Sequence, residues 1–296
     1  TSSDYGMTWT NRASSRNWQG LDCSGDASVI LAGVNGGYLY ISYDGGTTWT
    51  GRMTDASRVW PNTAVSHDGQ RMAAVVWGDP SGGYIYTSSD SGSNWTARMT
   101  DMNRHWNSLA CSSNGMTLVA GVHGGYPYVS YDAGTTWSQR TSMGMGEWWG
   151  FACSANGMTM LGAANYTNNL ILSTDGGTTW SPVASAGQRE WYDAAMSANG
   201  QRLVACDSSD TGRVFRSVNS GTTWTTDSAT QYWYGVASSV DGAYLMAGGI
   251  SGPIYVRADS LLVQEPPGTL RGAPCSAIEL LYIGNGRWLP LSCIGT

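Results

Sequence analysis

The segment SYDGGTTWT at residues 42–50 recurs with small changes in five other places, and this repetition predicts the fold. The other copies are SSDYGMTWT (2–10), SSDSGSNWT (88–96), SYDAGTTWS (130–138), STDGGTTWS (173–181) and SVNSGTTWT (217–225). Successive tryptophans of the motif are 40, 46, 42, 43 and 44 residues apart. A repeat of this length has room for four short strands and their turns, which is one blade of a β-propeller.

A second series of tryptophans lies between the copies of the motif. Each member precedes a serine by six residues: Trp18, Trp60, Trp106, Trp148, Trp191 and Trp233. In five of the six units, Asn-Gly or Asp-Gly follows two residues after that serine, as at Asp68-Gly69. Because these dipeptides favour a tight hairpin turn, each unit predicts strand, turn, strand, loop, strand, motif and strand.

The last unit indicates how the ring would close. After Trp233 it has three predicted strands, at about 234–239, 243–248 and 253–257, and no copy of the motif. The missing motif and outer strand are present at residues 2–15. We therefore expect an all-β fold in which residues 1–258 form a six-bladed β-propeller. Pairing of the N- and C-terminal strands in one blade would cover the exposed sheet edges.

Residues 259–296 lie outside the repeat and predict a C-terminal extension with a β-hairpin. The apolar stretches AIELLYIG (277–284) and RWLPLSCIG (287–295) flank Asn285-Gly286, a strong hairpin signal. An isolated two-stranded hairpin is only marginally stable, so this one packs either on its own propeller or on a second molecule. A disulfide between Cys275 and Cys293 is expected in a secreted protein, whereas Cys23, Cys111 and Cys153 share one repeat position and are expected to be small buried residues.

The repeated Ser-x-Asp-x-Gly-x-Thr-Trp pattern resembles the Asp-box, or BNR, repeat of sialidases, sortilin-type receptors, xyloglucan-active hydrolases and photosystem II assembly factors. The resemblance covers residues 1–258 and implies a β-propeller, but a fold by itself says little about activity. It also implies a structural turn between the outer two strands of each blade. The turn residues are Asp4, Asp44, Asp90, Asp132, Asp175 and Asn219, with Trp9, Trp49, Trp95, Trp137, Trp180 and Trp224.

The composition limits the classes of partner. Only 12% of the residues are charged, the formal net charge is −6, and the chain contains 15 arginines and no lysine. Nucleic-acid binding needs clustered basic residues and is not expected, and no apolar stretch is long enough to span a membrane. The Ser-, Thr-, Asn- and Tyr-rich surface favours a secreted or cell-surface protein. Because Thr1 directly precedes a copy of the motif, we expect the chain to be a processed product or a piece of a longer protein. In that setting Asn165, in the sequon Asn165-Tyr166-Thr167, is the expected glycosylation site.

Catalysis is not expected. The sequence lacks the Arg-Ile-Pro signature of sialidases, and its four glutamates are Glu147, Glu190, Glu265 and Glu279. Asp22 and Asp193, on the innermost predicted strands, could supply the two facing carboxylates of a glycosidase, but an aspartate beside a polar channel is more often only hydrated. The three histidines are dispersed, so neither a metal site nor a cofactor is expected.

A candidate binding face follows from the second tryptophan series. Its six tryptophans should form a ring near the axis together with Arg16, Arg58, Arg104 and Arg189. Aromatic rings beside arginine suit stacking on sugars or contact with a partner protein. The alternative is that these tryptophans only fill the space between blades. Further aromatic residues lie beside them, namely Trp149, Tyr192, Tyr232 and Tyr234.

Three functional hypotheses remain open. The main one is a non-catalytic extracellular structural or interaction module, a subunit of a surface appendage, fibre or adhesive assembly. Its partners would be further copies of itself or other extracellular glycoproteins. The second is a glycan-binding lectin or a degenerate glycosidase that uses the tryptophan and arginine face. The third is an assembly factor of the photosystem type.

Overall fold

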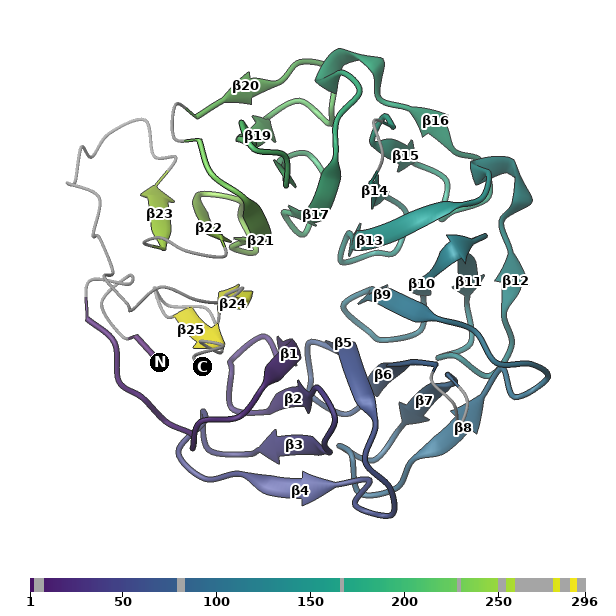
Figure 1. Ribbon diagram of the computed structural model, residues 1–296, viewed down its shortest axis with the longest axis vertical. Coiled ribbons are helices and arrows are strands. Elements are labelled where there is room, and N and C mark those ends of the chain that lie inside the picture. The colour runs from purple at the N-terminus through teal and green to yellow at the C-terminus, as the bar shows by residue number, and fades with distance from the viewer. Residues whose placement is uncertain are drawn as a thin grey trace.

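The computed structural model describes residues 1–2, 8–78, 83–165, 168–227, 230–249, 254–258, 279–282 and 288–291. Its β-sheets are arranged radially around a central axis, with the first strand of each sheet innermost (Figure 1). Helical structure in these residues consists of the two 3-10 turns Thr141–Met143 and Ala184–Ala186. The predicted all-β propeller architecture is therefore confirmed.

Six sheets, which we number as blades 1 to 6, follow one another in chain order. Blades 1 to 5 each have four antiparallel strands. Blade 1 contains β1 (Trp18–Cys23), β2 (Ile30–Val34), β3 (Leu39–Ser42) and β4 (Thr50–Arg52). Blade 2 contains β5 (Val59–Val65), β6 (Met72–Trp77), β7 (Ile85–Ser88) and β8 (Thr96–Arg98). Blade 3 contains β9 (Trp106–Cys111), β10 (Leu118–Gly125), β11 (Tyr128–Ser130) and β12 (Ser138–Gln139). Blade 4 contains β13 (Gly146–Cys153), β14 (Met160–Ala164), β15 (Ile171–Ser173) and β16 (Ser181–Pro182). Blade 5 contains β17 (Trp191–Met196), β18 (Leu203–Asp207), β19 (Val214–Ser217) and β20 (Thr225–Thr226). Blade 6 has β21 (Trp233–Ser238), β22 (Tyr244–Gly249) and β23 (Tyr255–Ala258).

The C-terminal hairpin takes a seventh position in the ring. It pairs β24 (Glu279–Tyr282) with β25 (Trp288–Leu291), and β24 contacts both β21 and β1 (Figure 1). The prediction had placed this hairpin outside a ring of six blades. A hairpin that is apolar along both strands is best covered between two other sheets, which accounts for the difference.

The N-terminal motif also belongs to this seventh position. The motif tryptophan of a blade packs in the interface with the preceding blade, as Trp224 does against a buried cluster formed by blades 4 and 5. Trp9 packs in the same way against Met246 and Ile254 of blade 6. The prediction that residues 2–15 complete blade 6 is therefore wrong, because Trp9 lies against the flank of that blade.

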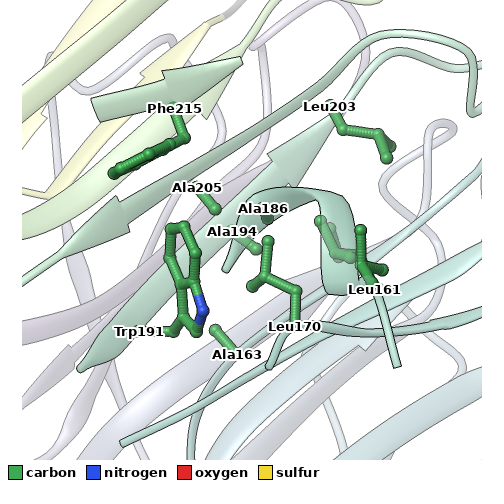
Figure 2. Packing of buried hydrophobic residues seen from close by; sticks show 11 residues of the cluster. Leu161, Ala163, Leu170, Ala186, Trp191, Ala194, Leu203, Ala205 and Phe215 are labelled. Atoms are coloured by element: carbon green, nitrogen blue, oxygen red, sulfur yellow. The ribbon is translucent and has the colours of Figure 1, made fainter. Parts of the chain in front are cut away.

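The interfaces between neighbouring blades hold the apolar core. Figure 2 shows the interface in which Leu161 and Leu170 of blade 4 lie close to Trp191 and Leu203 of blade 5. Trp191 is 0% exposed, and its ring meets that of Phe215 edge-on at 4.9 Å. Each large aromatic side chain thus removes apolar surface of two sheets from water, which is the main stabilising contribution of the ring.

A belt of backbone hydrogen bonds joins the turns that follow the innermost strands. In each link the N–H of one turn donates to the C=O of the turn in the next blade, at 2.7–2.9 Å. The belt passes through Gly25, His67, Ser113, Ala155, Ala198 and Val240. These turns lie at the opposite end of the innermost strands from the tryptophans, so the belt marks the face that we call the turn face.

The repeated motif forms the predicted turn. Asp175 accepts hydrogen bonds from the backbone N–H (2.9 Å) and the hydroxyl (2.6 Å) of Thr179, and Trp180 Nε1 donates to the Gly177 carbonyl (3.0 Å). Bonds to both groups of Thr179 lower the pKa of Asp175 to about 2. The other described motifs repeat these contacts, at Asp44, Asp90, Asp132 and Asn219. Asp4 lies outside the described residues.

The natural asparagine of the sixth motif leads to a prediction. Asn219 keeps the turn, since its Oδ1 accepts the Thr223 N–H and its Nδ2 donates to the Thr223 hydroxyl, both at 2.9 Å. We expect Asp132→Asn to change the Tm by at most about 2 °C, and Asp132→Ala, which removes both contacts to Thr136, to lower it by about 3–6 °C. Equal losses in the two variants, measured by thermal unfolding, would contradict this role.

Candidate binding face: an aromatic arc

Every innermost strand of blades 1 to 6 has a register shift directly after its tryptophan. In β13, β17 and β21 the shift falls at Trp149, Tyr192 and Tyr234. A β-bulge adds one residue to the strand and redirects its side chain. The same shift falls near Gln19 in β1, Pro61 in β5 and Asn107 in β9. The bulge position is therefore shared by the blades, but only blades 4 to 6 place an aromatic residue there.

The redirected rings form a continuous cluster near the axis. Trp149 and Tyr192 are stacked, with ring centroids 4.9 Å apart and planes at 20°, and Tyr234 lies 4.4 Å from Tyr192. His123 meets Trp149 edge-on at 5.8 Å. Trp77 lies 4.9 Å from His123 and 5.1 Å from His105. We call these six residues the aromatic arc; they extend over blades 2 to 6.

The histidine end of the arc is fixed by an extension of β10. His123 pairs with Glu147 across β10 and β13, and His123 Nε2 lies 3.4 Å from Glu147 Oε1. Both side chains are partly exposed, at 29% and 20%. This strand pairing links blades 3 and 4 and holds the His123 ring between Trp77 and Trp149.

The tyrosine end of the arc carries exposed and acidic groups. The Tyr232 hydroxyl donates to the carboxylate of Asp210, and this hydrogen bond raises the pKa of Tyr232. Away from the tyrosine end, the loops that lead into β9 and β13 carry Met102 and Met145, which are 58% and 65% exposed. Methionine adapts its shape readily to a partner, and exposed apolar side chains grouped on one face indicate an interaction site.

Two buried polar atoms of the arc have no hydrogen-bond partner among the described residues. They are Trp149 Nε1 and His123 Nδ1. An unsatisfied buried donor or acceptor costs about 1–3 kcal/mol. Because both atoms are shielded from solvent, a water molecule enclosed beside the rings would be needed to complete their hydrogen bonding.

The six inner-strand tryptophans are buried, so the predicted tryptophan recognition ring is wrong. Their exposed fractions do not exceed 8%. Instead, the Nε1 atoms of five of them donate to a glycine carbonyl earlier in the chain, as in Trp60 to Gly37 (3.2 Å) and Trp106 to Gly83 (3.1 Å). The alternative interpretation, that these tryptophans fill the space between blades, is confirmed.

The four arginines of the predicted face mostly complete this packing. Arg58 forms two hydrogen bonds with Asp55 (2.6 and 3.0 Å) and lies 5.3 Å from the Tyr86 ring. Arg104 repeats this arrangement with Asp101 and Tyr128. The other two arginines also cover rings, Arg16 that of Tyr40 (4.5 Å) and Arg189 that of Phe215 (4.4 Å). Cation–π contacts of this kind hold the guanidinium groups in place.

Asp22 and Asp193, the two carboxylates considered for a glycosidase, each join neighbouring blades. Asp22 accepts the N–H of Val65 in blade 2 (2.6 Å), and Asp193 accepts that of Val236 in blade 6 (2.9 Å). Each carboxylate also accepts the N–H of the residue that follows it. Burial raises the pKa of Asp22 to about 7 and that of Asp193 to about 6.

The cysteines and the sequon residue Asn165 are the remaining candidates from the sequence. Cys23 and Cys206 are buried free thiols, and Cys111 and Cys153 are half-buried free thiols. Cys275 and Cys293 lie outside the described residues. Asn165 follows β14 and is half-buried, and its backbone N–H donates to the Glu147 carbonyl (3.1 Å). Its glycosylation stays a prediction.

Within the described segments, no cluster of three or more His, Cys, Asp or Glu side chains could hold a metal ion. No helix in them is both long and apolar enough to cross a membrane.

Comparison with known proteins shows the fold. No protein-family model and no curated protein matches the sequence. Among solved structures, YCF48 from Cyanidioschyzon merolae has a TM-score of 0.65 at 18% identity, covering 93% of this chain and 92% of that one. YCF48 bound to a D1 peptide has a TM-score of 0.59 at 16% identity, covering 84% and 80%. An ancestral GH74 enzyme has a TM-score of 0.62 at 14% identity, covering 83% of this chain and 37% of that enzyme. The chain is thus similar to these proteins in being a β-propeller.

Sequence reasoning singled out Trp149, Tyr192 and Tyr234 but missed the other half of the arc. Trp77 ends β6 and His123 lies two residues before the end of β10, 46 residues further along the chain, so only the fold brings them together. The available signal was positional. Both residues follow the buried apolar run of the second strand, at the end that faces the tryptophan side of the ring.

Proposed function

We propose that this protein is a non-catalytic interaction module whose aromatic arc binds an extended polypeptide segment of a partner protein. The observation that carries the proposal is the arc itself, six aromatic rings on one face with exposed Met102, Met145 and Tyr232. Aromatic residues and methionine are enriched in protein–protein interfaces.

A polypeptide fits the arc better than a sugar. Sugar rings bind to aromatic side chains by covering a free ring face. Trp149 and Tyr192 stack one face on each other, and His123 and Tyr234 lie against them on either side, so few ring faces are left free for a ligand. The glycan-binding alternative is therefore the weaker of the two proposals for this face.

A solved structure supports this choice by analogy. The YCF48 propeller, which is similar to this chain in fold, was solved bound to a D1 peptide. An assembly factor that binds a peptide segment is one form of the function proposed here. An extracellular role in a fibre or adhesive assembly is another, and the lysine-free, weakly charged composition favours it. In both forms the protein works by binding and not by catalysis.

Peptide binding to paired variants tests the proposal. We expect Trp149→Ala/Tyr192→Ala to weaken binding of peptides selected from an immobilised random library by about tenfold or more, since aromatic anchors dominate interfaces. Tyr43→Ala/Tyr131→Ala is the matched control, because both tyrosines are exposed, at 43% and 47%, but lie beside the outer motifs. If the two double variants bind alike, or if no peptide binds the wild type, the proposal fails.

A further inference from the structure

Acidic side chains gather at the tyrosine end of the aromatic arc. Tyr232 donates to the Asp210 carboxylate, and the negative charge of Glu190 acts on the same phenol. Glu190 and the loop that carries Asp210 are joined by backbone, since the Ser208 N–H donates to the Glu190 carbonyl (3.0 Å). Asp210 is exposed and Glu190 half-buried. Two carboxylates therefore border the exposed Tyr232 and its neighbour Tyr234.

The cations nearby do not neutralise this end. Arg189 is engaged elsewhere, since its guanidinium lies 3.6 Å from Asp207 Oδ2 and covers the Phe215 ring at 4.4 Å. Arg213 is the exposed cation of the same loop, and the chain has no lysine. With Glu147 at the other end, three acidic groups stand on the arc against Arg213, while Arg189 is paired with Asp207.

Aromatic rings next to carboxylates form a favourable environment for a cation. The negative face of a tyrosine ring attracts an ammonium or guanidinium group, and a nearby carboxylate adds direct charge attraction. The long aliphatic stem of lysine or arginine would lie along the apolar rings while its charged head reaches the carboxylates. A neutral peptide would gain only the apolar part of this interaction.

We infer that the segment bound by the arc carries a lysine or arginine side chain, and that this side chain docks at Tyr232 and Tyr234 between Glu190 and Asp210. The inference rests on the proposed function, because it names the chemistry of the segment that the arc binds. It also gives that segment a direction, since the cation must lie at the tyrosine end and the neutral part at the histidine end.

The test compares charge-altered proteins with charge-altered peptides. The probe is an arginine-containing peptide selected on the wild-type protein, together with the same peptide in which citrulline, the neutral isostere, replaces arginine. We expect the citrulline peptide to bind roughly tenfold more weakly to the wild type. Glu190→Gln/Asp210→Asn should weaken the arginine peptide by a similar factor and leave the citrulline peptide unchanged.

A matched control removes the same charge from the turn face. Asp68→Asn/Asp241→Asn also deletes two carboxylates, and Asn114 shows that asparagine keeps this turn, with Oδ1 bonded to Ser112 (2.8 Å) and Met116 (2.9 Å). The control should bind the arginine peptide like the wild type. Equal binding of arginine and citrulline peptides, or equal weakening by both charge variants, would overturn the inference while the proposed function stands. If no peptide of any charge binds, the proposed function falls with it.

Discussion

Trp191→Ala should lower the free energy of unfolding by about 3–5 kcal/mol, the usual cost of removing a large buried aromatic side chain. Trp191 is 0% exposed and fills the interface between blades 4 and 5, where it touches the Phe215 ring (Figure 2). Its loss leaves a cavity that neither rigid sheet can close. Denaturant unfolding followed by far-ultraviolet circular dichroism would measure the change.

Two further variants make this experiment decisive. Trp191→Phe keeps most of the apolar volume and should cost clearly less than alanine, so it remains measurable if the alanine variant does not fold. Trp149→Ala removes a half-buried tryptophan of the arc and should cost less than Trp191→Ala while it impairs binding. If Trp149→Ala were the more destabilising of the two, the division between packing and binding tryptophans would be wrong.

Stability should decrease as the pH rises from about 4 to about 7, because of Asp22 and Asp193. Their pKa values, near 3.8 in an unfolded chain, are raised to about 7 and about 6 by burial. The folded protein therefore holds protons in this range that the unfolded chain has lost, and the stabilisation is lost as the pH passes the folded pKa values. A tenfold difference in proton affinity between the folded and the unfolded state contributes about 1.4 kcal/mol to the free energy of unfolding. At low pH the contribution is therefore on the order of 4 kcal/mol from Asp22 and 3 kcal/mol from Asp193.

Urea denaturation at a series of pH values would test this dependence. Asp22→Asn/Asp193→Asn should flatten the slope between pH 4 and 7, because asparagine does not titrate. The variant also replaces one of the two acceptor oxygens at each site by an NH2 group, so its stability below pH 4 should be lower than that of the wild type. A variant that keeps the wild-type slope would show that other groups cause it. Below pH 4 the opposite trend should appear, since hydrogen bonds hold the pKa of Asp44 and Asp175 at about 2.

The sequence predicts well what is local and repeated. The turn around Asp44 uses bonds within five residues, so the motif alone specifies it. The repeat pattern does not decide whether Trp60 is buried, because a fixed repeat position suits both a packed core and an exposed ring of tryptophans. The partner of Asp22 lies 43 residues away, and no local pattern indicates a bond that crosses between blades.

The closure of the ring was the main error. Asn285-Gly286 stands shortly before an apolar stretch, just as Asp68-Gly69 stands shortly before β6. This similarity was a signal for a seventh unit. The hairpin lacks the tryptophan and serine that mark the other six units, so the repeat pattern does not identify it as a further unit. Charge and aromatic content likewise indicated a binding face, but the bulges that create the arc leave no mark in the sequence beyond the residues themselves.

The belt on the turn face has a consequence for how such a chain can diverge. It is built from main-chain atoms, and the side chains along it differ widely, including glycine at Gly25, histidine at His67 and valine at Val240. Since every residue except proline supplies the N–H and C=O it needs, mutations can accumulate there without opening the ring. Neighbouring blades can thus stay joined along the belt whatever side chains it carries, so this face tolerates changes of sequence that the buried interfaces between blades do not.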